Sequence, residues 1–250
     1  MSGSFAGARV LVTGGTRGIG RSIAHAFEQA GATVFVCGRK PPTEPLGALR
    51  FLQADIRDAD QVTAMMERLV SEAGGIDVVV NNAGGSPPAD AATASARFSA
   101  AIIALNLTAP LLVSQAANAV MQKQEKGGSI INICSVSGLR PSPGTAAYGA
   151  AKAGLLNLTQ SLAVEWAPKV RLNAVTPGLI ATELSDMHYG SPEAQARVAA
   201  TVPAGRLGLP ADIASAVLFL ASAEASYVSG ANLVVHGGGE KPAFLDAASS

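Results

Sequence analysis

The stretch RVLVTGGTRGIG, residues 9–20, joins a short apolar run to a glycine-rich loop that includes Gly14, Gly18 and Gly20. The next stretch, RSIAHAFEQAGA at 21–32, has the apolar spacing of an amphipathic helix. Glycines at a strand–helix junction let backbone N–H groups approach a pyrophosphate at the start of the helix. An ordinary turn also uses glycine, but the position at the first junction of the chain favours a dinucleotide-binding loop.

Strand-like and helix-like stretches alternate along the rest of the chain. Apolar runs predict strands within residues 9–15, 33–39, 49–56, 76–85, 128–138, 170–178 and 231–238. Helical periodicity predicts helices within residues 21–32, 59–74, 95–124, 146–167 and 210–222, the third with a kink or break at Pro110.

The strand-like runs are apolar almost throughout, which is typical of strands covered on both faces. The pattern predicts an α/β fold, a Rossmann-type doubly wound parallel sheet with helices on both faces, in a single domain over residues 1–250. Residues 183–209 and 240–250 lack clear periodicity. We expect the first to be a substrate lid and the second a C-terminal tail.

The composition excludes several classes of function. The 250 residues include 18 basic and 18 acidic ones and no basic stripe, so nucleic acid is not an expected partner. The two cysteines lie far apart, which indicates neither a metal site nor a disulfide framework. Apolar stretches such as ASAVLFLAS are shorter than the roughly 20 residues of a membrane span, and no secretory signal is evident. We expect a cytoplasmic protein with no membrane partner.

The end of the second predicted strand bears on the choice of cofactor. An NAD site usually has an acid there for the ribose 2′-hydroxyl, whereas this chain has Arg39 and no acid. Arg17 lies inside the glycine loop, and two guanidinium groups can hold a 2′-phosphate. The pair favours NADP(H) over NAD(H), although two solvated arginines are the alternative.

Taken together, the motifs resemble the classical short-chain dehydrogenase/reductase family, including its 3-oxoacyl-(acyl-carrier-protein) reductases. T-G-x-x-x-G-x-G matches residues 13–20, N-N-A-G matches 81–84 and P-G-x-x-x-T matches 177–182. The resemblance covers residues 8–239 and implies a catalytic tetrad of Asn106, Ser135, Tyr148 and Lys152.

The resemblance also implies which residues contact the cofactor. They are Gly14, Thr16, Arg17, Gly18, Ile19, Gly20, Arg39, Asp55, Ile56, Asn82, Ala83, Gly84, Tyr148, Lys152, Pro177, Gly178, Ile180 and Thr182. The chain departs from the family at His236, where Asp or Asn is common.

Tyr148 and Lys152 lie four positions apart, so a helix would place them on one face. A free tyrosine has a pKa of about 10, and a neighbouring ammonium group is expected to lower it. The phenol could then exchange a proton with a carbonyl oxygen that Ser135 also binds. In the family, Lys152 would hold the nicotinamide ribose and Asn106 a water that resupplies protons. Taken singly, each of these residues is more often structural.

We therefore predict an enzyme that transfers a hydride between NAD(P) and a carbonyl or secondary alcohol, with a 3-oxoacyl thioester as one candidate substrate. A steroid, sugar or other secondary alcohol oxidised with NAD is the alternative. An enoyl reductase is disfavoured, because such family members space Tyr and Lys more widely. A non-catalytic dinucleotide sensor would not need Ser135, Tyr148 and Lys152 together.

The helix predicted at 146–167 is apolar or small nearly all round, so it must be buried on most sides. Family members use this helix between subunits, which implies a homo-oligomer, a tetramer by resemblance. Burial entirely within one chain is the alternative.

Overall fold

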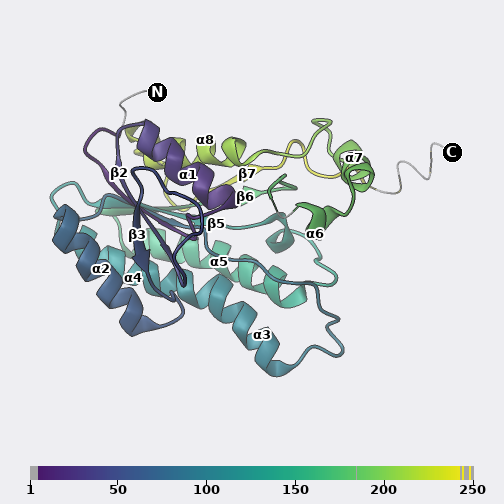
Figure 1. Cartoon of the computed structure of the whole chain (residues 1–250), viewed down its shortest axis with the longest axis horizontal. Coiled ribbons are helices and arrows are strands. Elements are labelled where there is room, and N and C mark those ends of the chain that lie inside the picture. Colours follow the sequence, from purple (N-terminus) through teal and green to yellow (C-terminus); the bar gives the residue numbers. More distant parts are fainter. Residues whose placement is uncertain (1–4, 184, 243, 245–247, 249–250) are drawn as a thin grey trace.

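The computed structural model describes residues 5–183, 185–242, 244 and 248, and it forms a seven-stranded parallel sheet between two layers of helices (Figure 1). The order is β3-β2-β1-β4-β5-β6-β7. The strands are β1 (Arg9–Thr13), β2 (Thr33–Gly38), β3 (Arg50–Gln53), β4 (Val78–Asn81), β5 (Gly128–Ile133), β6 (Val170–Pro177) and β7 (Asn232–Val235). The predicted doubly wound fold is confirmed, with the order reversing beside β1.

Helices fill the connections between strands. They are α1 (Gly18–Gln29), α2 (Ala59–Ala73), α3 (Ala96–Ile103), η1 (Ala104–Thr108), α4 (Ala109–Met121), η2 (Val136–Gly138), α5 (Ala146–Glu165), α6 (Ser185–Tyr189), α7 (Pro192–Thr201), α8 (Pro210–Ala221) and η3 (Ala223–Ala225). α1 and α8 cover one face of the sheet, while α2, α4 and α5 cover the other (Figure 1).

The two hydrophobic cores follow from the alternation of side chains along the strands. In β1, Val10 and Val12 pack in the core that contains Phe27 of α1, whereas Leu11 packs in the core that contains Leu69 of α2. All five side chains are fully buried or nearly so. Both faces of the sheet are therefore covered, which is why its strands are apolar throughout.

The predicted break near Pro110 takes the form of one π-helical turn, η1, between α3 and α4. The N–H of Ala109 bonds to the carbonyl of Ala104, five residues earlier. The combined helix Ala96–Met121 is long and apolar enough to cross a membrane. No apolar stretch of that length was predicted from the sequence. The α4 part of this helix packs on the sheet with Val113, Ala117 and Met121 fully buried, which gives these apolar residues a structural role in the fold.

The segment 183–209 is not irregular, as its sequence suggested, because it contains α6 and α7. Ser191 precedes α7 and its hydroxyl accepts a hydrogen bond from the N–H of Ala194, while Pro192 occupies the first turn. A serine cap followed by proline is a recognisable helix start that the periodicity test missed, since α7 has no fully buried residue. Residues 240–242 of the predicted tail are described, and the N–H of Lys241 donates to the carbonyl of Thr201 at the end of α7.

Candidate active site

The predicted site lies at the carboxyl edge of the sheet, where parallel strands all end. β1 leads into the glycine loop, and its neighbour β4 leads into the N-N-A-G segment. β5 and β6 follow in order and lead to Ser135 and to the 177–182 segment. The topology therefore brings all four motifs to one edge.

The glycine loop has positions that only glycine fits easily. Gly14 and Gly18 have φ of 64° and 53°, in the left-handed region. Gly20 faces the amide of Asn82 and the carbonyl of Gly14 so closely that a β-carbon would overlap both. Thr16 and Ile19 are half-buried beside these glycines. An open cradle of backbone at the start of α1 fits the pyrophosphate of a dinucleotide.

The N-N-A-G segment braces this cradle. The hydroxyl of Thr13 accepts hydrogen bonds from the N–H groups of Asn82 and Ala83, each at 3.0 Å. The Asn82 side chain donates to the carbonyls of Thr13 and Gly14 at 2.9 and 3.2 Å. Asn82 and Ala83 were predicted as cofactor contacts, and the structure gives them this supporting position as well. Thr13 was overlooked, although it opens the first motif.

A buried chain of polar side chains fastens α5 to the sheet. Asn81 donates to Asn132 at 2.9 Å, and Asn132 donates to the hydroxyl of Thr159 at 2.9 Å. Thr159 in turn donates to the carbonyl of Leu155 at 2.7 Å. All of these groups are buried, so the chain holds α5 in one position, and α5 carries Tyr148 and Lys152.

The structure places Ser135, Tyr148 and Lys152 together. Nζ of Lys152 lies 5.7 Å from the centre of the Tyr148 ring and donates to the carbonyl of Ile133 at 2.7 Å. The Ser135 and Tyr148 side chains share a hydrogen bond. Lys152 is only 3% exposed, whereas Tyr148 is half-buried. A substrate oxygen at this point would therefore meet the phenol and the serine hydroxyl.

Asn106 joins the same cluster from the π-helical turn η1, where it is fully buried. Its Oδ1 accepts from the N–H of Gly85 at 2.9 Å, and its Nδ2 donates to the carbonyls of Gly85 and Ile102. A β-carbon on Gly84 would lie 2.6 Å from that Oδ1 and 3.3 Å from Nζ of Lys152. Gly84 thus has to be small for the loop to approach Asn106 and Lys152.

The acid–base prediction for Tyr148 needs a correction. Burial raises the pKa of Tyr148 above its ordinary value, and the hydrogen bond with Ser135 opposes this rise only in part. The expected lowering of the pKa by Lys152 is not among the causes. Burial instead lowers the pKa of Lys152 itself to about 8, while the nearby Cys134 acts in the opposite direction. The sequence spacing correctly indicated that Tyr148 and Lys152 are close, but burial decides the direction in which each pKa shifts.

This lowered pKa predicts a pH-dependent stability. Between pH 8 and pH 10.5 the unfolded chain binds more protons at Lys152 than the folded chain, so stability rises with pH across that window. The cost of keeping Lys152 charged below pH 8 is about 3 kcal/mol. A variant without the ammonium group would also lose the hydrogen bond to Ile133, which contributes about 1 kcal/mol.

Lys152→Met is therefore expected to stabilise the fold by about 2 kcal/mol at pH 7. Urea unfolding of both proteins from pH 7 to pH 10.5 measures this difference, which should shrink as the pH rises. A difference that is constant with pH would contradict the lowered pKa.

The adenosine end carries the predicted arginines. Arg17 and Arg39 are both exposed, and neither forms an ion pair within the residues that the structure describes. Arg57 binds the carboxylate of Asp55 through two hydrogen bonds of 2.9 and 2.5 Å. These bonds lower the pKa of Asp55 to about 2. Ile56 is buried beneath it. The pairing of Arg57 with Asp55 was not predicted from the sequence.

The segment after β6 closes the site on its other side. β6 ends at Pro177, and Gly178 lies so close to His236 that a β-carbon would be 2.7 Å from that residue's Cβ. Ile180 is buried and pairs with Gly208 as an isolated bridge. The N–H of Thr182 donates to Oγ of Ser185 at 2.8 Å, which joins this segment to α6.

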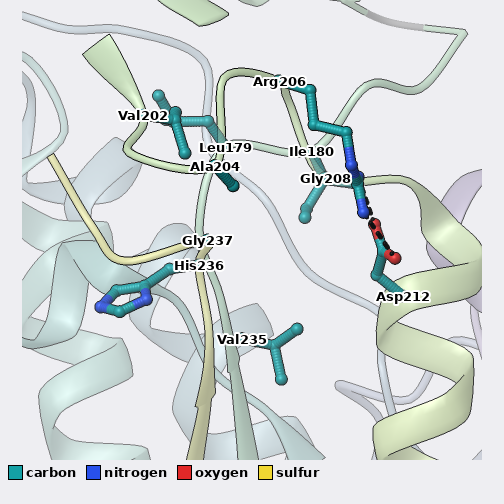
Figure 2. A pocket seen from close by; sticks show the side chains of 10 residues that line it. All are labelled: Leu179, Ile180, Val202, Ala204, Arg206, Gly208, Asp212, Val235, His236 and Gly237. Carbon is teal, nitrogen blue, oxygen red and sulfur yellow. Dashed lines mark hydrogen bonds and ion pairs between the residues drawn. The ribbon is translucent and has the colours of Figure 1, made fainter.

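Two cavities flank the site, and the tetrad lines neither. The larger, of about 160 Å³, lies between the segment after β6, the segment before α8 and the end of β7, with Ile180 and His236 among its walls (Figure 2). The ion pair of Arg206 and Asp212, at 2.7 Å, stands at one side of it (Figure 2). The smaller, of about 80 Å³, lies between residues 86–99 and 144–147, mostly among alanines. The N–H of Ala89 bonds to Gly144 there and links the two loops.

The described side chains give little support for a metal site or for a reactive thiol. Among the described residues, no three His, Cys, Asp or Glu side chains gather as metal ligands would. Cys37 and Cys134 are free and buried. Burial raises the pKa of Cys37 to about 12 and that of Cys134 to about 11, which suits inert thiols. The side chain of His188, which was considered as a lid contact, lies outside the described residues.

Comparison with known proteins gives a consistent result. Residues 14–240 match the family model described as enoyl-(acyl carrier protein) reductase. The chain is 40% identical over 242 residues to a 3-oxoacyl-(acyl-carrier-protein) reductase of Salmonella typhimurium, covering 94% of this chain and 98% of that protein. It is also 40% identical over 240 residues to a 3alpha-hydroxysteroid dehydrogenase of Mediterraneibacter gnavus, covering 91% and 94%.

A solved structure agrees with these relatives. The ligand-free aldohexose dehydrogenase of Thermoplasma acidophilum superposes with a TM-score of 0.90 at 33% identity, covering 95% of this chain and 96% of that one.

Proposed function

The chain belongs to the short-chain dehydrogenase/reductase family and acts on an alcohol or carbonyl group with NAD(P), and we propose that it works as an NADPH-dependent carbonyl reductase. The observation that carries the proposal is the convergence of Ser135, Tyr148 and Lys152 beside Gly84. No other group of side chains in the described structure unites a proton donor, a hydroxyl and a cation at the edge where the glycine loop opens.

The chain's own residues would divide the work as follows. NADPH, when bound, supplies the hydride. The hydroxyl of Tyr148 would give its proton to the carbonyl oxygen, a role that its raised pKa suits in the direction of reduction. The hydroxyl of Ser135 would donate a hydrogen bond to the same oxygen and stabilise the charge that develops there.

Lys152 and Asn106 would support that step. The Lys152 ammonium lies 5.7 Å from the Tyr148 ring, where its charge would stabilise the phenolate left after proton transfer. Its remaining N–H groups would hold the ribose of the nicotinamide. Asn106 anchors Gly85 and so keeps Gly84 against Lys152. Gly14, Gly18 and Gly20 would receive the pyrophosphate, and the 177–182 segment would contact the nicotinamide end.

As substrate we propose a 3-oxoacyl thioester. The resemblance to the Salmonella typhimurium reductase supports it, as do the small, uncharged side chains of the loops beside Tyr148. Arg140, the one charged residue of residues 136–147, is held by Glu240 at 2.5 Å, so no free cation there selects an anion. A sugar or steroid alcohol is the second candidate, favoured by the Thermoplasma acidophilum and Mediterraneibacter gnavus relatives. The spacing of Tyr148 and Lys152 disfavours enoyl reduction.

The cofactor choice gives the first test. Titration with NADPH and with NADH, followed by nicotinamide fluorescence, should show tighter binding of NADPH. Arg39→Ala is expected to weaken NADPH binding at least about 10-fold and to leave NADH unchanged, because only the 2′-phosphate needs the guanidinium. Arg68→Ala, on the exposed side of α2, is the matched control. A preference of the wild type for NADH would overturn the NADPH assignment and favour an oxidising dehydrogenase.

We also propose a cytoplasmic homo-oligomer, a tetramer by family resemblance. Support comes from Val164 of α5, which is 80% exposed, and from Ile103 at the end of α3, which is 39% exposed. α3 and α5 lie side by side (Figure 1), so a second copy could cover both residues. Sedimentation velocity measures the mass directly, and a monomer would rule this out.

A further inference from the structure

The carboxylate of Glu183 lies over the glycine loop. A β-carbon on Gly18 would be 3.5 Å from Oε1 of Glu183 and 3.7 Å from Oε2. Gly18 is the first residue of α1, so the carboxylate stands at the start of that helix. Glu183 belongs to a distant part of the chain, at the junction between the segment after β6 and the predicted lid.

The start of α1 is a favourable place for a negative charge. The first turn of α1 contains no acidic residue, and its N-cap, Arg17, makes no capping hydrogen bond with its side chain. α2 and α7, in contrast, are capped by the side chains of Asp58 and Ser191. The unpaired N–H groups and the dipole of α1 therefore attract an anion from elsewhere, and the carboxylate nearest to Gly18 is that of Glu183.

The same helix start is where the proposed function places the pyrophosphate. Two anions cannot share it without repulsion, because both would use the positive end of one helix. We infer that Glu183 is a competing anion that occupies the pyrophosphate position in the cofactor-free enzyme and must leave when the dinucleotide binds. This inference rests on the proposed function and adds a link between cofactor binding and the lid.

The link runs through the residues next to Glu183. Two hydrogen bonds link Thr182 and Ser185. The N–H of Thr182 donates to Oγ of Ser185 at 2.8 Å, and the N–H of Ser185 donates to the Thr182 carbonyl at 3.0 Å. Ser185 is buried and begins α6, so moving Glu183 shifts the start of α6. At the other end of α6, Tyr189 is one of the lesser causes of the raised pKa of Tyr148. Displacement of Glu183 would thus move α6 and change the surroundings of Tyr148.

Glu183→Gln tests the inference, because it removes the charge and keeps the shape. We expect NADPH and NADH both to bind about 5-fold more tightly, which corresponds to loss of one screened repulsion at the helix start. In the cofactor-free protein, amide hydrogen exchange across residues 185–201 should become faster, because α6 loses its anchor. Glu67→Gln makes the same charge change on the exposed side of α2, away from the glycine loop and from residues 185–201, and it should alter neither quantity.

The outcomes separate the two proposals. Unchanged or weaker dinucleotide binding by Glu183→Gln, with normal binding by the wild type, would overturn the competing-anion role and leave the reductase proposal standing. Unchanged hydrogen exchange in the lid would overturn the link to α6. A wild type that binds neither NADPH nor NADH would refute the proposed function itself, and this inference with it.

Discussion

Tyr148→Phe is expected to lower kcat about 10²- to 10⁴-fold, the usual contribution of a positioned proton donor. The substitution removes only the hydroxyl, which shares a hydrogen bond with Ser135 and lies in the cluster with Lys152. The ring and its packing in α5 are retained. Steady-state oxidation of NADPH in the presence of a 3-oxoacyl thioester measures the effect.

The pattern of the loss identifies the role. Binding of NADPH should remain within about twofold of the wild type, because the glycine loop is untouched. Tyr227→Phe is the matched control, since Tyr227 is fully exposed and should keep full activity. If Tyr148→Phe retains the kcat of the wild type, Tyr148 is not the proton donor.

The features that could be predicted from the sequence are those that local stretches carry. The alternation of apolar runs and helical periodicity was enough for the parallel doubly wound sheet, because each strand is covered on both faces and so is apolar throughout. The glycine loop was equally visible, since four glycines within the seven positions 14–20 are rare unless backbone must approach a ligand or turn sharply.

What could not be predicted depends on contacts between distant residues. The chain from Asn81 through Asn132 to Thr159 joins three separate elements, and nothing local marks these residues as partners. The ion pair between Arg57 and Asp55 is different, since it is local, but no motif marked Arg57 as a partner of Asp55.

The prediction that Lys152 lowers the pKa of Tyr148 was wrong for a related reason. Spacing along a helix shows that a cation is near, but the raised pKa comes chiefly from burial, which only the packed structure reveals. The helices α6 and α7 were missed because they are amphipathic only weakly and bury little. In α7 the serine cap and proline were the available signal.

Gly20→Ala is expected to lower the affinity for NADPH more than about 100-fold and to destabilise the fold by about 3 kcal/mol. A β-carbon there would overlap the amide nitrogen of Asn82 and the carbonyl of Gly14. Asn82 cannot move aside, because its side chain bonds to the carbonyls of Thr13 and Gly14. The loop itself must therefore shift, and its N–H groups would no longer point at the pyrophosphate.

Gly154→Ala is the matched control for this substitution. Gly154 also lies within a helix, α5, but a β-carbon there would meet only the flexible side chain of Leu107 at 3.2 Å. The Leu107 side chain has to move only slightly, and replacing a helical glycine with alanine stabilises by up to about 1 kcal/mol, so this variant should bind NADPH normally and unfold no more easily. Fluorescence titration and urea unfolding of both variants decide the matter. If Gly20→Ala binds NADPH as well as Gly154→Ala does, the cofactor does not rest on the backbone at the start of α1, and the assignment of this loop as the pyrophosphate site fails.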